Sequence, residues 1–228
     1  MFNIKIMKTI LLNFLKGILA GLAIGLGGFL YILMVHYVDG ELGKVLGSTL
    51  FAIGLFLVCT FKLSLYTGKI GNVYEGKLDI YSYISLPVML IGNAIGAISL
   101  GYLCFFIFRN TDIMKTVTAT CQTRLAFNNF NDYLSCIVKS FLCGTCVYLA
   151  VKCFNLNRLK PLGISLLVFF VFIFVYCGFQ HCIANMFYFG FGNTYSNGYT
   201  YLNLGLVILF NSFGPIIGVG LVKAIKNK

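Results

Sequence analysis

The sequence predicts an all-α membrane protein with six transmembrane helices, and two observations carry that prediction. Hydrophobic residues make up 59% of the 228 residues and charged residues only 10%, whereas soluble domains carry about 25% charge. The apolar residues gather in about six stretches, each long enough to span the hydrocarbon core as a helix of about 20 residues. Because these spans use nearly the whole chain, we expect a single membrane domain, 1–228.

Each span is an apolar run between polar segments. The second and fifth runs are interrupted at 62–69 and 177–181 by Gly, Ser, Thr, Gln and His. Because non-helical backbone is tolerated at membrane depth only where it is buried or faces a water-filled cavity, we expect broken second and fifth helices. The segment 109–132 is expected to be a loop with some amphipathic character. The expected spans are 11–37, 44 to the first break, 81–108, 133–154, 161–191 and 201–225.

The distribution of Lys and Arg predicts the orientation. With an even number of spans, both termini lie on one side, and that side carries most of the Lys and Arg in short loops. Such residues concentrate in the cytoplasm, so we expect a multi-pass protein of the cell (inner or plasma) membrane with both termini cytoplasmic. The basic residues that give the chain its net charge of +11 flank apolar runs. We therefore expect the lipid bilayer, and no nucleic acid, as a partner.

Two motifs recur along the chain and suggest an internal repeat. Lys16-Gly-Ile-Leu-Ala-Gly21 resembles Lys139-Ser-Phe-Leu-Cys-Gly144 at an offset of 123, and Gly92-Asn-Ala-Ile-Gly96 resembles Gly214-Pro-Ile-Ile-Gly218 at an offset of 122. Three spans per half would insert in opposite orientations, so the pattern predicts inverted repeats over about 11–108 and 133–225. The alternative is generic G-x-x-x-G helix packing. The two breaks fall at different offsets and do not extend the match.

The strongest functional candidate is His181, in Gly178-Phe-Gln-His181 within an otherwise apolar run. Ionisable residues at membrane depth are costly and mark functional sites, and imidazole exchanges protons near neutral pH. Thr67, at the other break, would supply a hydroxyl opposite His181. Lys16 and Lys139 stand a few residues inside their spans, where each would attract anions or extend to the headgroups.

Three apolar residues, Phe51, Leu55 and Phe174, precede the breaks by a few turns and are candidates for constrictions that exclude hydrated ions. Cys143 and Cys146 form a C-x-x-C, which leaves a membrane thiol oxidoreductase as an alternative. A neutral-solute pore of the aquaporin type is a second alternative, although the sequence has no Asn-Pro-Ala motif. No acidic pair, zinc-type ligand set, P-loop or nucleophile elbow is visible, so we expect a protein that is not an enzyme and that holds no metal or cofactor.

Together these motifs resemble the formate/nitrite transporter family from Lys16 to Val222. Phe14-Leu-Lys-Gly-Ile-Leu-Ala-Gly21 resembles the start of its first span, Leu65-Tyr-Thr-Gly68 its Leu-Phe-Thr-Gly break, and Gly178-Phe-Gln-His-Cys-Ile-Ala-Asn-Met186 its Gly-Phe-Glu-His-Ser-x-Ala-Asn-Met string. The resemblance implies an aquaporin-like inverted repeat and a homopentamer with one pore per protomer.

The resemblance also implies roles for individual residues. His181 would be the central protonatable group with Thr67 opposite it, Lys16 and Lys139 the vestibule cations, and Asn185 the family's Asn after the His. Constrictions would lie at Phe51, Leu55 and Tyr66 on the cytoplasmic side and at Leu65 and Phe174 on the outer side.

Departures from the family pattern bear on the substrate. Gln180 stands where the family has Glu, Ser64 where an acidic residue is usual, and Gly144 where an Asn is common in the fourth span. Gln180 removes a negative group beside the His. The expected function is a pentameric channel or proton-coupled carrier for formate, nitrite or hydrosulfide, the last because the hydrosulfide channels are a divergent branch of the family.

Overall fold

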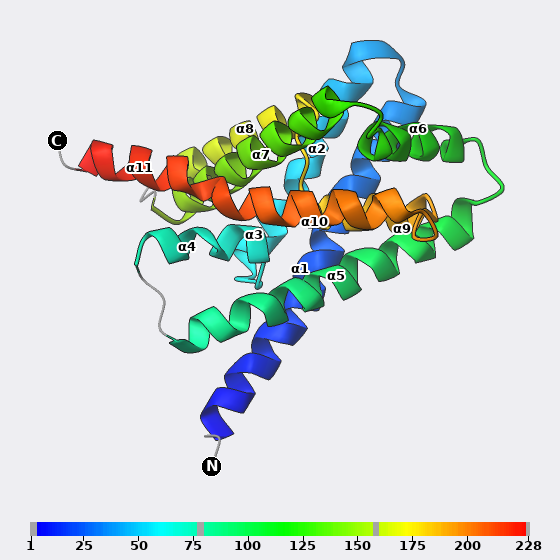
Figure 1. Ribbon diagram of the computed structural model, residues 1–228. Helices are drawn as coiled ribbons and strands as arrows, with labels where there is room; N and C mark the ends of the chain where they lie inside the picture. Colours follow the sequence, from blue (N-terminus) through cyan, green and yellow to red (C-terminus); the bar gives the residue numbers. More distant parts are fainter. Residues whose placement is uncertain (1–3, 77–79, 157–159, 227–228) are drawn as a thin grey trace.

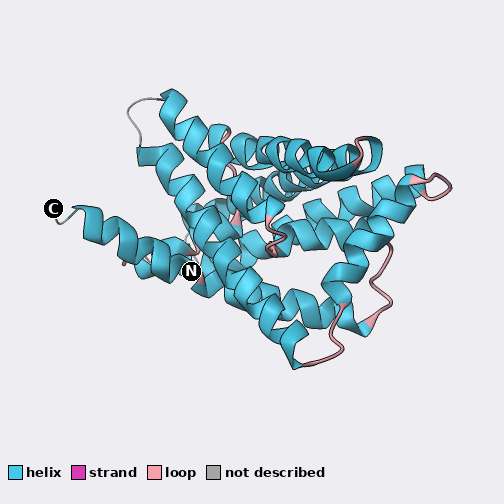
Figure 2. Cartoon of the chain, turned by 90° about the horizontal axis from the view of Figure 1, so that it is seen from above, coloured by secondary structure: helices cyan, strands magenta, loops and turns pink. Residues whose placement is uncertain are grey.

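The computed structural model describes residues 4–76, 80–156 and 160–226, and this part of the chain is helical without strands (Figures 1 and 2). The predicted all-α class is therefore confirmed. The helices are α1 (Ile4–Tyr37), α2 (Gly40–Thr60), α3 (Tyr66–Lys69), α4 (Gly71–Tyr74), α5 (Ile80–Phe108), α6 (Ile113–Leu125), α7 (Phe130–Leu156), α8 (Lys160–Tyr176), α9 (Cys182–Phe191), α10 (Gly198–Phe213) and α11 (Pro215–Lys226).

Five helical stretches of the described chain are long and apolar enough to cross a membrane. They are Met7–Tyr37, Gly40–Thr60, Tyr81–Phe108, Phe130–Asn155 and Gly198–Ala224. The fifth predicted span corresponds to two shorter apolar helices, α8 and α9. The prediction of a broken fifth helix is thus confirmed, while the count of six spans stays a prediction.

The predicted loop 109–132 contains a helix, α6, so its assignment as loop is wrong. α6 buries one stripe, Ile113, Val117 and Cys121, at a spacing of four residues, while Gln122 beside it is exposed. That spacing places the apolar side chains on one face of the helix. The expected amphipathic character is confirmed, and α6 uses it to pack on α1, α9 and α10.

Two helix pairs pack closely through glycines, α1 on α5 and α7 on α10. A Cβ atom on Gly21 would lie within 3.0 Å of the Asn93 carbonyl oxygen, and one on Gly144 would lie equally close to the Asn211 carbonyl oxygen. Real Cβ atoms do not approach backbone this closely, so only glycine permits these crossings. α9, whose residues are all buried, packs against α5, α1 and α10.

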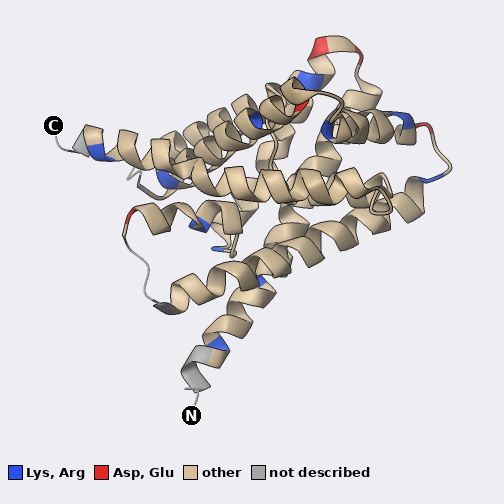
Figure 3. Ribbon diagram, in the orientation of Figure 1, with Lys and Arg blue, Asp and Glu red and all other residues tan. Residues whose placement is uncertain are grey.

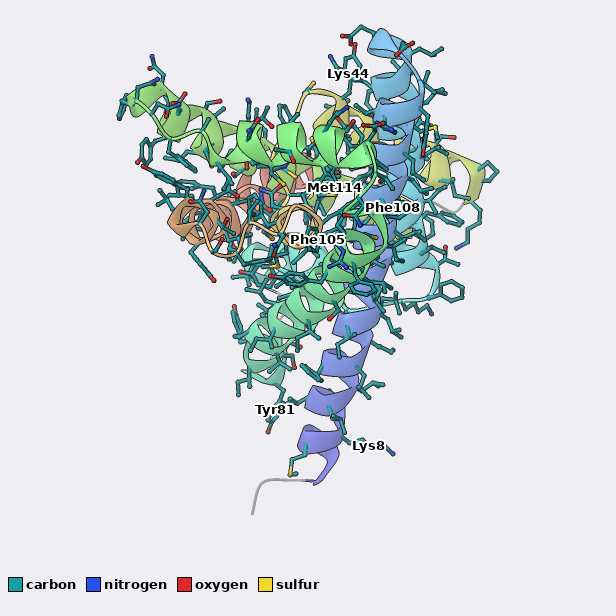
Figure 4. The ribbon with its side chains drawn as sticks, turned by 90° about the vertical axis from the view of Figure 1, so that its right-hand side faces the viewer. Lys8, Lys44, Tyr81, Phe105, Phe108 and Met114 are labelled. Atoms are coloured by element: carbon teal, nitrogen blue, oxygen red, sulfur yellow. The ribbon has the colours of Figure 1, made fainter. Side chains whose placement is uncertain are left out.

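Charged residues are sparse along the long helices and gather near helix ends and loops (Figure 3). Figure 4 places Lys8 and Lys44 toward opposite ends of the molecule. Large apolar side chains such as Leu15, Leu103 and Phe106 are exposed on the outer faces of the helices. An exterior of this kind suits lipid rather than water as the surrounding solvent.

Candidate functional site

The second and fifth spans break with the same backbone geometry. Residues 61–65 separate α2 from α3, and residues 177–181 separate α8 from α9. Each break turns at a residue with positive φ, Lys62 (51°) and Gly178 (68°). Three backbone hydrogen bonds close each turn. At the first break the N–H groups of Phe61, Lys62 and Leu63 donate to the carbonyls of Leu57, Cys59 and Val58, respectively. At the second break those of Cys177, Gly178 and Phe179 donate to the carbonyls of Ile173, Val175 and Phe174.

These bonds repeat at a constant offset of 116 residues. This offset differs from the offsets of 122 and 123 of the sequence motifs, as expected. The sequence does not reveal that the breaks correspond, because the equivalent positions carry unlike side chains, Lys62 against Gly178 and Leu65 against His181. The backbone conformation, which the sequence pattern does not report, is what the two breaks share.

A buried asparagine of α5 holds the first break. The Oδ1 atom of Asn93 accepts the Tyr66 N–H at 2.8 Å, and its Nδ2 donates to the carbonyls of Gly17 (2.8 Å) and Ser64 (2.9 Å). The Asn93 side chain is fully buried. It thereby satisfies backbone groups that a broken helix would otherwise leave unpaired away from water.

A second buried asparagine, in α10, holds the other break in the same way. The Oδ1 atom of Asn211 accepts the Cys182 N–H at 2.9 Å, and its Nδ2 donates to the carbonyls of Ser140 (2.7 Å) and Gln180 (2.8 Å). Asn211 is also fully buried. Sequence analysis missed both asparagines, because neither stands at a break.

The two asparagines correct the register of the proposed repeat. Asn93 and Asn211 are 118 residues apart, and Gly96 and Gly214 make equivalent close approaches to backbone at the same offset. The sequence match at an offset of 122 is therefore wrong by four residues. A shift of four is about one helical turn, so it keeps small residues on the same face and cannot be detected from the G-x-x-x-G pattern.

The breaks bring His181 and Thr67 into contact, although they are 114 residues apart. His181 Nε2 lies 2.8 Å from Thr67 Oγ1, and the exposures of the two residues are only 2% and 0%. His181 also caps α9, because its Nδ1 accepts the Ala184 N–H at 3.2 Å. Since Nδ1 is an acceptor, the neutral ring carries its proton on Nε2 and donates to Thr67 Oγ1.

Separate cavities open from the two breaks. One of about 360 Å³ is lined by His181, together with Lys139 and Arg124. Another of about 250 Å³ is lined by Leu65, together with Lys62 and Lys69. We call them the His181 cavity and the Leu65 cavity. Each carries cationic side chains, and each is lined by one of the two structurally equivalent residues of the breaks.

A family model described as formate/nitrite transporter matches residues 2–225. The chain belongs to the formate/nitrite transporter family. This family comprises transporters and channels rather than enzymes, and the chain is accordingly a multi-pass membrane protein.

Two curated relatives and one solved structure are similar to it. The chain is 28% identical over 221 residues to "Uncharacterized transporter YrhG" of Bacillus subtilis, across 90% of this chain and 81% of that protein. It is 25% identical over 197 residues to "Formate channel FocA" of Haemophilus influenzae, across 80% and 67%. Its fold matches a solved structure named "Pentameric formate channel with formate bound" with a TM-score of 0.77 and 22% identity, across 96% and 98%.

Within this family fold, the residues expected to form the two constrictions are grouped differently than predicted. Phe51 and Phe174 were expected on opposite sides, yet their rings contact edge-on at a centroid distance of 5.6 Å and both line the His181 cavity. Leu65, expected beside Phe174, lines the Leu65 cavity instead. The cause is the direction of α2. This helix starts at Gly40 and reaches Phe51 well before its break, so Phe51 does not lie on the side of the break where Leu65 stands.

The other predicted site residues occupy varied positions. Leu55 is buried and Tyr66 donates or accepts a hydrogen bond with Ser212 Oγ at 2.8 Å, and neither residue lines the two cavities. Lys16 lines neither cavity either, but its carbonyl accepts the Ser64 N–H, as the Lys139 carbonyl accepts that of Gln180. The vestibule role expected for Lys16 therefore stays a prediction.

Arg124 is a residue of the site that sequence analysis missed. It stands in α6, where a loop was expected, and its Nε donates to Asn185 Oδ1 at 3.0 Å. Its guanidinium lies 4.5 Å from the ring centroid of Tyr188. Asn185 was selected from the motif beside His181, but a residue 61 positions away that binds it gives no local sequence signal.

The C-x-x-C pair does not resemble a redox site. Cys143 is fully buried, Cys146 is partly buried, and both are free thiols. A reactive cysteine is accessible and stabilised as thiolate by nearby positive charge, which a fully buried thiol is not. The described residues also contain no group of three His, Cys, Asp or Glu side chains able to hold a metal ion.

Proposed function

We propose that this chain forms a channel or proton-coupled carrier for small monovalent weak-acid anions, namely formate, nitrite or hydrosulfide. The observation that carries the proposal is the contact between His181 Nε2 and Thr67 Oγ1 at 2.8 Å, where the two breaks meet. It joins a protonatable ring at membrane depth to a hydroxyl from the other half of the chain. The presence of cations in the cavities beside both breaks supports an anion as the permeant species.

The proposed passage uses charge, apolar contact and hydrogen bonding in turn. Lys139 raises the local anion concentration in the His181 cavity. The rings of Phe51 and Phe174 exclude a fully hydrated ion. The anion then exchanges its water for the Nε2–H of His181, and it is neutralised in part by that hydrogen bond or fully by a proton delivered through His181. It crosses past Leu65 as the uncharged acid or as a strongly hydrogen-bonded anion.

We further propose a homopentamer with one pore per protomer, and inverted repeats over about 11–108 and 133–225. The pentamer is proposed by analogy with the similar pentameric channel, whose fold this chain shares. The repeat is supported by the shared bonding pattern of the two breaks and by the two asparagines that hold them. The placement of both termini in the cytoplasm is supported by the distribution of Lys and Arg in the short loops.

The proposal is tested by substituting the ring that it depends on. His181→Phe keeps an aromatic side chain and removes both nitrogens, and we expect it to reduce formate, nitrite and hydrosulfide flux into proteoliposomes to the level of empty vesicles. The matched control is His36→Phe, since His36 lies at the end of α1 and bonds Thr116 at 3.1 Å. The control should retain flux. Native mass spectrometry of both variants checks the oligomer.

Flux near the wild-type level in His181→Phe would refute the role of the ring. Glycerol is measured in the same vesicles, because permeation by glycerol without permeation by any of the three anions would favour the neutral-solute pore. The wild-type measurements extend from about pH 5 to 8, the interval in which a histidine changes charge.

A further inference from the structure

The His181 cavity contains an amide whose orientation is fixed by a chain of hydrogen bonds. Arg124 Nε can only donate, so Asn185 must accept with Oδ1 (3.0 Å). The Nδ2 of Asn185 is then a donor, and it lies 2.9 Å from Gln180 Oε1. The Nδ2 of Asn203 donates to the same oxygen at 2.8 Å and also to the Arg124 carbonyl. Gln180 Oε1 is therefore the acceptor of two N–H groups.

This arrangement leaves Gln180 Nε2 as a free donor. Gln180 is only 7% exposed and lines the cavity. No group in residues 4–76, 80–156 or 160–226 accepts a hydrogen bond from Nε2. Nε2 is therefore open to the cavity and bonds no described protein group, so it is suited to a ligand that supplies an acceptor.

The positive charge of Arg124 is fixed in place but is not neutralised by the protein. Its Nε and Nη1 bond to Asn185 Oδ1 and to the Thr120 carbonyl (2.7 Å), both neutral acceptors, and its guanidinium carbon lies over the Tyr188 ring. None of the acidic side chains in the described part of the chain forms an ion pair with it. Nη2 has no partner there, and the residue lines the same cavity as Gln180.

Lys139 adds a second cation to this cavity. It is half-buried, and its Nζ likewise has no hydrogen-bond or ion-pair partner among the described residues. Two unpaired cations and a free amide thus line one space of about 360 Å³. Charge-assisted hydrogen bonds from a fixed guanidinium match the flat, two-oxygen edge of a carboxylate or nitrite. A hydrosulfide ion, with one sulfur, does not offer two acceptors in that geometry.

We propose that Arg124 and Gln180, together with Lys139, form a selectivity site that holds a planar two-oxygen monovalent anion before it reaches His181. The inference rests on the proposed function, and it makes formate and nitrite, rather than hydrosulfide, the anions that the site distinguishes. Arg124 supplies the charge and part of the fork, and Gln180 supplies a donor that makes no competing bond within the protein.

The test combines direct binding with flux. Gln180→Glu keeps the Oε1 acceptor for Asn185 and Asn203 but turns the free donor into a carboxylate, and Arg124→Gln removes the charge. Binding of ¹³C-formate to the purified protein in detergent is followed by NMR, and the half-saturating formate concentration is measured in proteoliposomes. Losing one charge-assisted bond should weaken formate binding, and raise the half-saturating formate concentration, by about tenfold or more. Hydrosulfide flux should change much less.

Two matched controls receive the same substitutions at exposed positions. Gln122→Glu lies in α6 and Arg109→Gln follows α5, and both side chains are exposed. These variants should bind formate as the wild type does. Unchanged binding and half-saturation in both Gln180→Glu and Arg124→Gln would overturn the proposal, as would absence of formate and nitrite binding to the wild type. If the two site variants lose formate binding and the control variants keep it, but the wild type shows no flux, the site is supported and the proposed transport is refuted.

Discussion

The asparagine that holds the second break is the most informative place to perturb the fold. Replacing Asn211 by Leu keeps the side-chain size and removes three hydrogen bonds, to Cys182 N, Ser140 O and Gln180 O. Asn211 is fully buried, so water does not reach the freed backbone groups. Each such unsatisfied group costs about 1–3 kcal/mol, which gives about 3–9 kcal/mol in total.

This loss is a large share of the roughly 5–15 kcal/mol by which folded proteins are stable. We therefore expect Asn211→Leu to lower the melting temperature by at least about 6 °C, at about 2 °C per kcal/mol for a chain of this size. The assay is thermal denaturation in detergent, followed by circular dichroism and by size-exclusion recovery. The control is Asn155→Leu, because Asn155 is exposed and its Nδ2 donates to Val151 O within its own helix.

A companion variant tests whether the two breaks are energetically alike. Asn93→Leu removes the same three kinds of bond at the first break, so its melting temperature should fall by a similar amount. If Asn211→Leu melts together with Asn155→Leu, the argument that the asparagine amides hold the breaks is refuted. If only one of the two buried variants is destabilised, the equivalence of the breaks is lost.

Two further predictions concern packing and thiol chemistry. Gly96→Ala places a Cβ against the Ile18 carbonyl and should destabilise the α1–α5 pair. The control Gly205→Ala has open space around it and should be neutral or slightly stabilising, because alanine favours the helix. Equal melting temperatures of the two variants would contradict this prediction. Cys177 is exposed and Cys143 fully buried, so maleimide followed by peptide mass spectrometry should label Cys177 and leave Cys143 unmodified. Labelling of Cys143 at a comparable rate would reopen the redox alternative.

The sequence by itself determined the solvent of this protein and the places where its helices break. Long apolar runs have few stable arrangements except as membrane helices, because every backbone group must be satisfied within the segment. A polar residue in such a run is costly, so His181 and the Gly, Ser and Thr around Thr67 stand out as exceptions without knowledge of any contact. These local signals also led to the family, whose motifs lie beside the same breaks.

Only the tertiary structure decided how the two halves correspond and which groups line the cavities. The register of the repeat depends on Asn93 and Asn211, whose partners lie 27 to 76 residues away along the chain. From the sequence, Arg124 was assigned to a loop and Gln180 was interpreted only as the replacement of a negative side chain. In the structure both bond to Asn185, which places one cation and one free donor on the same cavity. Hydrophobic periodicity reports the environment of each residue, whereas hydrogen-bond partners between distant helices depend on the packing of the whole chain.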